Sequence, residues 1–207
     1  MLFYTTDTND HGLPHDPFKA IVAPRPIGWI STRSRDGAVN LAPYSFFNAI
    51  SDRPKLIMFS SAGMKDTASF AIESGEFVAN LATRTLAAEL NRSSAPAPRG
   101  VSEFAFSGLT EAACRIVAAP RVAESPAALE CKVTQWFQPE GLNGTVSENT
   151  VVIGQVVAIH IDEAILKDGM IDMALAAPLA RLGYLDYSVS DEVFQMRRPR
   201  SADGSDV

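Results

Sequence analysis

Residues 60–67 (Ser-Ser-Ala-Gly-Met-Lys-Asp-Thr) combine the side chains best suited to holding an anion, at a point where a predicted strand passes into a helix. The first N–H groups of a helix have no partners within it, and together with the helix dipole they attract negative charge. Lys65 adds a positive charge, and Gly63 allows close backbone approach. The sequence therefore predicts a phosphate site, with hydroxyl donors from Ser60, Ser61 and Thr67.

A second interpretation of this stretch is purely structural. Asp66 can cap the helix while Lys65 points into water. An aspartate also weakens a purely electrostatic attraction for phosphate, unless backbone amides occupy its carboxylate. The sequence alone leaves both interpretations open.

Residues 42–51 (Ala-Pro-Tyr-Ser-Phe-Phe-Asn-Ala-Ile-Ser) mix aromatic and small polar side chains where a strand is expected to give way to a loop. Alternate residues of an extended chain share a face, and neither face here is wholly apolar or wholly polar. A planar aromatic ligand with polar ring edges suits such a surface; an edge strand whose aromatics cap the core also explains it. One face carries Tyr44, Phe46 and Asn48, and the other Ser45, Phe47 and Ala49.

Several isolated residues are further candidates. Arg25 and Thr32 bracket the first predicted strand and either could contact a ligand, although Arg25, between two prolines, equally suits a surface position. His160 ends an apolar strand, where it is either a structural histidine or a residue near a redox centre. Glu130 and Cys131 have no evident acid–base partner.

Motifs of other chemistries are missing. G-x-G-x-x-G and G-x-x-x-x-G-K-[ST] are absent, so neither a Rossmann fingerprint nor a P-loop is predicted, and no G-x-S-x-G elbow occurs. The only cysteines, Cys114 and Cys131, form no C-x-x-C pair, and the histidines are scattered. We therefore expect neither a disulfide framework nor a metal centre.

Composition places the chain among ordinary globular proteins. Its 207 residues are 46% hydrophobic and 20% charged, which argues for one folded domain. The net charge of −6 disfavours nucleic-acid binding. With no evident signal peptide or membrane span, a cytoplasmic protein is expected. We predict an N-terminal arm over residues 1–17, a domain over 18–190, and a C-terminal segment over 191–207 with a mobile tail containing Arg197, Arg198 and Arg200.

The expected elements are mostly strands. Strand pairing should begin near Ile27, because Pro24 and Pro26 cannot donate ladder hydrogen bonds, and Arg35-Asp36-Gly37 predicts a hairpin turn. Residues 99–125 show only short mixed pieces, and 178–184 form a turn-and-aromatic cluster. Six or so strands with few short helices indicate an antiparallel α+β protein or a barrel. Further strands are expected over 55–60, 76–81, 128–137 and 151–162, and helices over 66–74 and around 86–90, the latter broken by 93–98.

Taken in order, several fragments resemble the flavin reductase-like family of FMN-binding split barrels. That family includes reductase partners of two-component monooxygenases and flavoredoxin-type proteins. Together the fragments extend over most of the chain from about residue 18 to residue 187. They are residues 24–32 (PRPIGWIST), 40–48 (NLAPYSFFN), 65–67 (KDT), 76–81 (EFVANL), 130–131 (EC), 154–160 (GQVVAIH) and 181–184 (RLGY).

The resemblance implies an antiparallel split β-barrel with a few short helices that dimerises and holds FMN in a groove near the subunit interface. It places residues 45–48 along the flavin ring and residues 60–67 near the phosphate, and it makes His160 a candidate catalytic residue. The FMN-binding residues implied together by the residues and the resemblance are Thr32, Asn40, Tyr44, Ser45, Phe46, Phe47, Asn48, Ser60, Ser61, Lys65, Asp66 and Thr67.

Three functional hypotheses follow. The first is an FMN reductase that takes hydride from NADH or NADPH and passes electrons to an acceptor, such as a partner monooxygenase; no separate nicotinamide motif is present. The second is a flavoredoxin-like electron-transfer protein with little NAD(P)H activity, and the third is an interaction module without flavin. A homodimer is expected, because relatives build the groove from two chains and an exposed Phe46-Phe47 pair would be costly.

Overall fold

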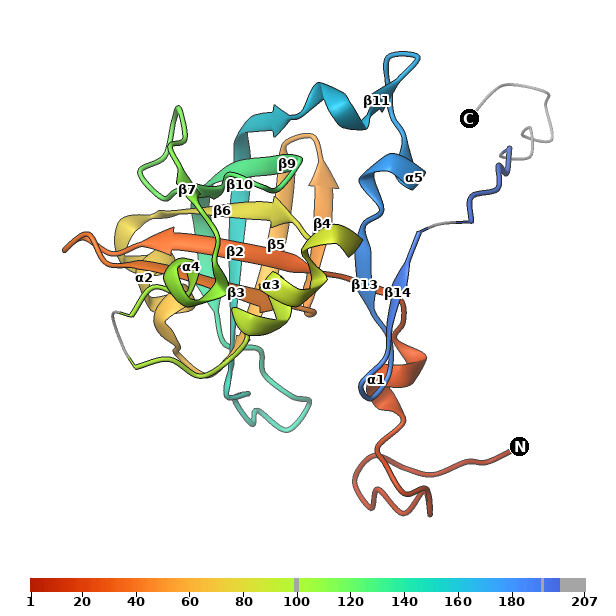
Figure 1. Ribbon diagram of the computed structural model, residues 1–207. Helices are drawn as coiled ribbons and strands as arrows, with labels where there is room; N and C mark the ends of the chain where they lie inside the picture. The colour runs from red at the N-terminus through yellow and green to blue at the C-terminus, as the bar shows by residue number, and fades with distance from the viewer. Residues whose placement is uncertain (99–100, 191, 198–207) are drawn as a thin grey trace, which may run out of the picture.

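A seven-stranded antiparallel sheet forms the body of the protein and curls into a barrel (Figure 1). The computed structural model describes residues 1–98, 101–190 and 192–197. The strand order is β3-β2-β6-β9-β10-β5-β4. The strands are β2 (Gly28–Arg33), β3 (Val39–Tyr44), β4 (Phe47–Asp52), β5 (Lys55–Ala62), β6 (Glu76–Leu81), β9 (Ala127–Phe137) and β10 (Asn149–Ile161).

The two edges of this sheet meet at a bend in the chain. β3 and β4 lie at opposite ends of the strand order, yet only Ser45 and Phe46 separate them. The Phe46 carbonyl accepts a hydrogen bond from the Ser60 N–H at 2.8 Å, and the rings of Tyr44 and Phe59 lie 5.1 Å apart. The expectation that this strand gives way to a loop is therefore wrong: the chain bends and continues as a strand on the other edge.

Helix α2 (Asp66–Ser74) packs against the barrel interior, and its bounds confirm the predicted helix over 66–74. Its small residues Ala68 and Ala71 allow close packing against the strands and are fully buried. Gly154 of β10 is needed for the same packing, because a side chain there would meet the Phe77 ring at 2.5 Å. The interior cluster comprises Ile30, Ile57, Phe59, Ala68, Ala71, Phe77, Ala79, Cys131 and Val152.

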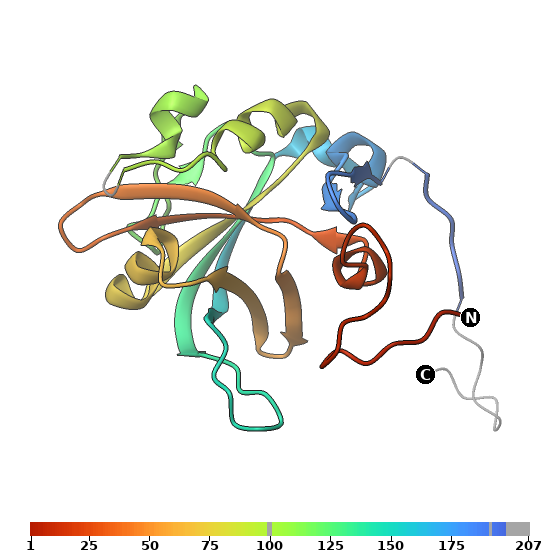
Figure 2. The same cartoon turned by 90° about the horizontal axis from the view of Figure 1, so that it is seen from below.

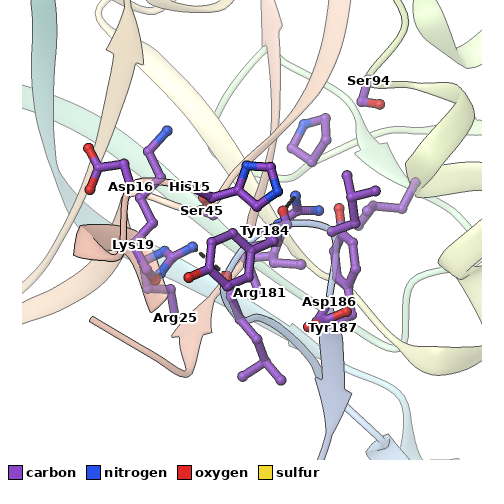
Figure 3. A pocket seen from close by; sticks show the side chains of 15 residues that line it. His15, Asp16, Lys19, Arg25, Ser45, Ser94, Arg181, Tyr184, Asp186 and Tyr187 are labelled. Atoms are coloured by element: carbon purple, nitrogen blue, oxygen red, sulfur yellow. Dashed lines mark hydrogen bonds between the residues drawn. The ribbon is translucent and has the colours of Figure 1, made fainter. Parts of the chain in front are cut away.

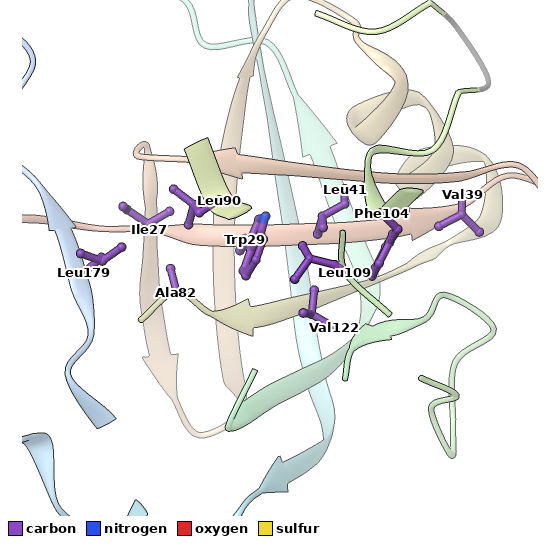
Figure 4. Close-up of a cluster of buried hydrophobic side chains, with 10 residues drawn as sticks. All are labelled: Ile27, Trp29, Val39, Leu41, Ala82, Leu90, Phe104, Leu109, Val122 and Leu179. Carbon is purple, nitrogen blue, oxygen red and sulfur yellow. The ribbon is translucent and has the colours of Figure 1, made fainter. Parts of the chain in front are cut away.

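A second apolar cluster lies on the outer face of β2 and β3 (Figure 4). Because side chains alternate along a strand, Trp29 and Leu41 point away from the interior cluster. They are covered by α3 (Ala87–Arg92), α4 (Glu103–Ser107) and β8 (Arg121–Val122). The Trp29 indole N–H donates to the Ser93 hydroxyl at 2.9 Å, so its polar atom is satisfied.

A smaller sheet stands beside the barrel, together with α1 (Phe18–Ile21) and the N-terminal arm (Figure 2). It contains β1 (Arg25–Pro26), β13 (Leu179–Arg181) and β14 (Tyr187–Val189). Strand pairing therefore begins before Ile27, contrary to expectation, although the barrel strand itself begins at Gly28. Pro26 is tolerated because β1 lies at the edge of its sheet.

The predicted barrel strands are present in the structure. They are those expected over 55–60, 76–81, 128–137 and 151–162, and the last has bulges in its pairing to β9. Residue 191 and residues 198–207, including Arg198 and Arg200 of the expected tail, lie outside the described residues, as do 99 and 100. In the described part of the chain no helix is long and apolar enough to cross a membrane.

The remaining elements are short. They are η1 (Arg84–Leu86), β7 (Glu111–Ala112), η2 (Glu163–Ile165), β11 (Leu166–Lys167), β12 (Met170–Ile171) and α5 (Met173–Ala176).

Candidate ligand-binding groove

Two adjoining pockets form a groove that runs from the start of α2 to the small sheet. One measures about 410 Å³ and lies at the start of α2; the other measures about 770 Å³ and lies against β13 and the N-terminal arm. Both are lined by Pro43 and Ser94, so they meet across the end of β3. We call them the α2 pocket and the arm pocket. A groove of this size can hold a ligand with a ring at one end and a charged group at the other.

The α2 pocket contains an uncapped helix N-terminus. Lys65 occupies the N-cap position in an extended conformation, and no side chain of the described residues caps the helix. Asp66 is the first helical residue, so the interpretation of Asp66 as the N-cap is wrong. Lys65 is exposed and lines the pocket, whereas Asp66 is half-buried and engaged in interactions of its own. The amides of the first turn and the Lys65 ammonium group together suit an anion.

A buried polar network forms one wall of the α2 pocket. The Asn40 amide donates to both carboxylate oxygens of Glu103 at 3.0 Å, and the Leu41 N–H donates to one of them at 2.9 Å. The Thr67 hydroxyl in turn donates to the Asn40 carbonyl oxygen. Since α2, β3 and α4 each contribute a member, this network fixes the three elements around the pocket.

Two titratable groups at this pocket have raised pKa values. Burial raises the pKa of Glu103, and the hydrogen bond from the Leu41 N–H only partly offsets this, while the nearby Asp66 adds to it. Burial likewise raises the pKa of the Tyr44 phenol, against the opposing effect of a hydrogen bond with Thr67. The carboxyl groups of Glu103 and Asp66 both lie at this pocket. A bound anion therefore has to be held by Lys65 and the helix amides.

The structure brings about half of the predicted FMN-binding residues into the groove. Asn40, Tyr44, Lys65, Asp66 and Thr67 line the α2 pocket, and Ser45 lines the arm pocket. The other predicted residues line neither pocket: Thr32 and Ser61 are fully buried, Ser60, Phe46 and Phe47 are half-buried, and Asn48 is exposed on β4.

Sequence reasoning missed several groove residues. Glu103 is a single glutamate in a segment of short mixed pieces, and no spacing linked it to Asn40. Ser93, Ser94 and Pro96 were interpreted only as a break after a helix, yet they line the α2 pocket. Their Ser-Pro composition was the one available signal, since loops of this kind commonly carry ligand contacts.

His160 lies outside the groove and forms a buried cluster with Glu130. Its Nε2 atom lies 2.6 Å from a Glu130 carboxylate oxygen, so the expectation that Glu130 lacks an acid–base partner is wrong. The same carboxylate accepts the N–H groups of Arg115, Ile116 and Val117 at 2.7–2.9 Å. Burial alone would raise the pKa of Glu130, but these four donors outweigh it and lower the pKa to about 2.

Cys114 completes this cluster. Its sulfur, a Glu130 oxygen and a His160 nitrogen lie within 4.8 Å of one another. The donor types suit a metal ion, but the Glu130 oxygens are already committed to four hydrogen bonds. Burial and the Glu130 charge raise the pKa of Cys114 to about 11, so this thiol is not activated for nucleophilic chemistry. The described contacts of the cluster are thus the hydrogen bonds to Glu130, with the Cys114 sulfur close by.

Comparison with known proteins identifies the family. Residues 22–180 match the model of the flavin reductase like domain, so the chain belongs to the flavin reductase-like family. A curated relative, an uncharacterized protein from Halalkalibacterium halodurans, is 37% identical over 183 residues, which cover 86% of this chain and 87% of the relative.

Solved structures agree with this assignment. Nitrilotriacetate monooxygenase component B from Bacillus cereus superposes with a TM-score of 0.86 at 28% identity, covering 95% of this chain and 98% of that protein. A Shewanella frigidimarina protein with a split barrel domain has a TM-score of 0.78 at 23% identity, covering 95% of this chain and 94% of that protein. The fold of this chain is the split barrel of that family, as the sequence predicted.

Proposed function

We propose that this protein is an FMN-dependent reductase that takes electrons from NADH or NADPH and delivers them to an acceptor. The observation that carries the proposal is the groove itself, which joins an uncapped helix N-terminus carrying Lys65 to a slot bounded by Pro43 and Ser45. Family membership and the likeness to a monooxygenase component B support it. They also make a partner monooxygenase a reasonable acceptor.

The residues present fit FMN. The amides of the first turn of α2 lack a capping side chain, which matches the need of a phosphate for donors. Lys65 adds the charge, and Pro43, Tyr44 and Ser45 would border the ring and its polar edge. When bound, FMN supplies the redox chemistry. The chain supplies position, charge and shielding from water, and Glu103, Asn40 and Thr67 hold the wall of the pocket in place.

A homodimer is part of the proposal, but the Phe46-Phe47 argument for it is wrong. Both rings are half-buried within the chain, and Phe47 packs against the interior cluster. Apolar surface is exposed elsewhere instead, with Ile159 and Ile161 of β10 at 50% and 45% exposure. Multi-angle light scattering at micromolar concentration should report twice the chain mass, and a monomer with flavin bound would contradict the proposal.

The visible spectrum of the purified protein tests flavin binding directly. We expect a yellow chromophore that is released on denaturation, or that appears after FMN is added and excess ligand removed. Neither outcome is compatible with a flavin-free interaction module. Failure to bind FMN under both conditions would overturn the proposed function.

Nicotinamide oxidation separates the reductase from its rival. With FMN present, the reductase should oxidise NADH or NADPH in repeated turnovers while an acceptor such as oxygen is available. A flavoredoxin-like electron-transfer protein would bind FMN equally well but oxidise neither nicotinamide at a comparable rate. Following the nicotinamide absorbance with each donor in turn also gives the donor preference.

A further inference from the structure

A third pocket lies at the end of β10 and measures about 440 Å³. Its walls come from β8, β9, β10 and the segments on either side of β8. We call it the β10 pocket. Among the described residues, none that lines it also lines the α2 pocket or the arm pocket. It is therefore a separate cavity, of a size that can hold a small organic molecule.

Arg121 brings a positive charge to this pocket from an anchored stretch of backbone. Its neighbour Val122 is fully buried, and the Val122 N–H donates to the Asn80 side-chain oxygen at 2.8 Å. Since successive side chains of a strand point to opposite sides, Val122 faces the apolar cluster around Trp29 and Arg121 faces the pocket. The short strand β8 thus holds Arg121 at the pocket wall.

The guanidinium group of Arg121 has no hydrogen-bond or ion-pair partner in the part of the chain that the structure describes. Its Nε atom is buried without a hydrogen bond, and the ion pairs of the described residues do not include it. Buried donors in folded proteins are nearly always paired. This donor is therefore suited to a group that comes from outside the chain.

Arg115 is the second cation of the pocket. Its backbone N–H donates to a Glu130 oxygen at 2.9 Å, which fixes the residue at the pocket wall. Its side chain is exposed and forms no ion pair with the residues that the structure describes. Two guanidinium groups with unused donors therefore line one cavity.

The arginines of the arm pocket, by contrast, have partners within the chain (Figure 3). Arg25 donates to three backbone carbonyls. Arg181 donates to the Tyr184 carbonyl, and its guanidinium carbon lies 4.4 Å from the centre of the Tyr187 ring. Within the described chain, the two arginines of the β10 pocket make no such contacts.

The two carboxylates that line the β10 pocket already accept N–H groups. Glu130 accepts four hydrogen bonds, one of them with His160, and Asp162 accepts the Ala164 N–H at 2.9 Å. The pocket thus has unused donors while its acceptors are engaged, which favours an acceptor as ligand over a cation. The rest of the wall is apolar and consists of Ala123, Pro126, Ala158, Ile159 and Ile161.

We propose that the β10 pocket binds a small organic anion, whose carboxylate or phosphate group pairs with Arg115 and Arg121 and whose short apolar body lies against Ala158 and Ile159. The planar guanidinium fork matches the oxygens of either head group. The site is separate from the proposed flavin groove, so the inference does not depend on the proposed function.

Calorimetric titration of the FMN-saturated protein tests the proposal, because bound FMN keeps the probes out of the α2 pocket. Four probes share one butyl or propyl body: butyrate and butyl phosphate are anions, butyramide is neutral and butylammonium is a cation. We expect butyrate, butyl phosphate or both to bind at least tenfold more tightly than butyramide and butylammonium. Tighter binding of butyrate identifies a carboxylic acid as the ligand class, and tighter binding of butyl phosphate identifies a phosphate ester.

Acetate and inorganic phosphate test the apolar wall. They carry the same head groups with little or no apolar body, so each should bind more weakly than its longer counterpart. Acetate and phosphate that bind as tightly as butyrate and butyl phosphate would overturn the assignment of the apolar body.

Three variants assign the binding to this pocket. Arg121→Gln and Arg115→Gln each remove one charge-assisted contact and should weaken the tighter anion about tenfold. Arg181→Gln is the matched control at the arm pocket and should leave the anion affinity unchanged. The unfolding midpoint and the mass from light scattering check that fold and oligomeric state are retained. If Arg121→Gln does not fold, Arg121→Lys, which keeps the charge but not the fork, takes its place and should also weaken binding.

Several outcomes would overturn the inference. They are the absence of anion binding, equal binding of butyramide or butylammonium, and a loss of affinity in Arg181→Gln but in neither variant of the β10 pocket. Failure of the proposed function is a different result, because FMN itself would then not bind. The probes would in that case be titrated against Lys65→Ala, and a dependence on Arg115 and Arg121 would still support the β10 site.

Discussion

Two buried glutamates at different places in this barrel show opposite behaviour. Glu130 of β9, which contacts His160 of β10, accepts four hydrogen bonds, and its pKa is lowered to about 2. Glu103, beside the groove, is held among the described residues by the Asn40 amide and the Leu41 N–H, and its pKa is raised. Burial acts on both in the same direction, so the outcome depends on the donors that each carboxylate accepts and, at Glu103, on the nearby Asp66 charge. The first site is saturated and structural, and the second retains capacity for interaction next to a ligand.

The two carboxyl groups therefore change stability in opposite directions as pH rises. Glu130 stabilises the fold above its unfolded-state pKa, and this contribution is lost as pH falls from about 4.5 towards 2. Glu103 has a raised pKa, so its contribution is present at low pH and is lost as pH rises through that value. Substitutions at the two sites should separate these effects.

Glu130→Gln should cause the largest loss of stability. The amide cannot accept from four donors, and it places its own N–H groups against two of them, so we expect a loss of about 3–5 kcal/mol. Urea unfolding at neutral pH gives the value, and repeating it down to pH 3 should show a flatter acid dependence than in the parent. The matched control is Glu111→Gln, whose half-exposed pair with Arg33 at 3.4 Å should matter little. Equal losses in the two variants would contradict the saturated-site interpretation.

Lys65→Ala tests the ligand-facing side of the comparison. If Lys65 makes a charge-assisted bond to the FMN phosphate, its loss should cost about 1.5–3 kcal/mol of binding free energy, or roughly 10–150-fold in Kd. Riboflavin, which has no phosphate, should be affected much less. Flavin titration monitored by fluorescence gives both affinities, with Lys55→Ala on the exposed Asp52 pair as control. If both flavins weaken equally, or neither does, Lys65 does not bind the phosphate.

The sequence predicted local elements well because their signals are local. Gly75 ends α2 in the left-handed conformation with φ of 77°, as its position after residues 66–74 indicated. The Arg35-Asp36-Gly37 turn joins β2 to β3 as expected, with Gly37 at φ of 90°. The order of the family-like fragments predicted the split barrel, because that order reflects the whole fold rather than one motif.

The predicted site was less complete because it depends on contacts distant in sequence. Thr32 and Ser61 have the right chemistry for a ligand, but the strand pleat directs both into the barrel interior. Conversely, Glu103 meets Asn40 from 63 residues away, and Glu130 meets His160 from 30. No periodicity in the sequence predicts these two contacts, because they depend on how the sheet closes and on which loop covers it.

Thr67→Val sharpens the comparison at the groove. The hydroxyl of Thr67 donates to the Asn40 carbonyl, and both side chains are buried in the wall of the α2 pocket. Its removal leaves a buried acceptor unpaired, so we expect about 1–3 kcal/mol of lost stability and weaker FMN binding. Thr150→Val is the isosteric control, because the Thr150 hydroxyl is fully buried with no hydrogen-bond partner in the described chain. Thr150→Val should leave the free energy of unfolding unchanged or slightly higher. If it lowers this free energy as much as Thr67→Val does, the hydrogen bonds of Thr67, Asn40 and Glu103 contribute nothing specific to stability.

His160→Ala should have the smallest effect and decides the role of the predicted catalytic histidine. The substitution removes one of the four donors to Glu130, at a side chain that is 23% exposed and can be replaced by water. We therefore expect a stability loss of about 0.5–1.5 kcal/mol, well below that of Glu130→Gln. Because His160 lines neither pocket of the groove, the rate of flavin reduction in stopped-flow experiments should match the parent once the folded fraction is equal. A slower reduction with stability and FMN affinity unchanged would instead place His160 at the redox site and contradict its assignment to the saturated cluster.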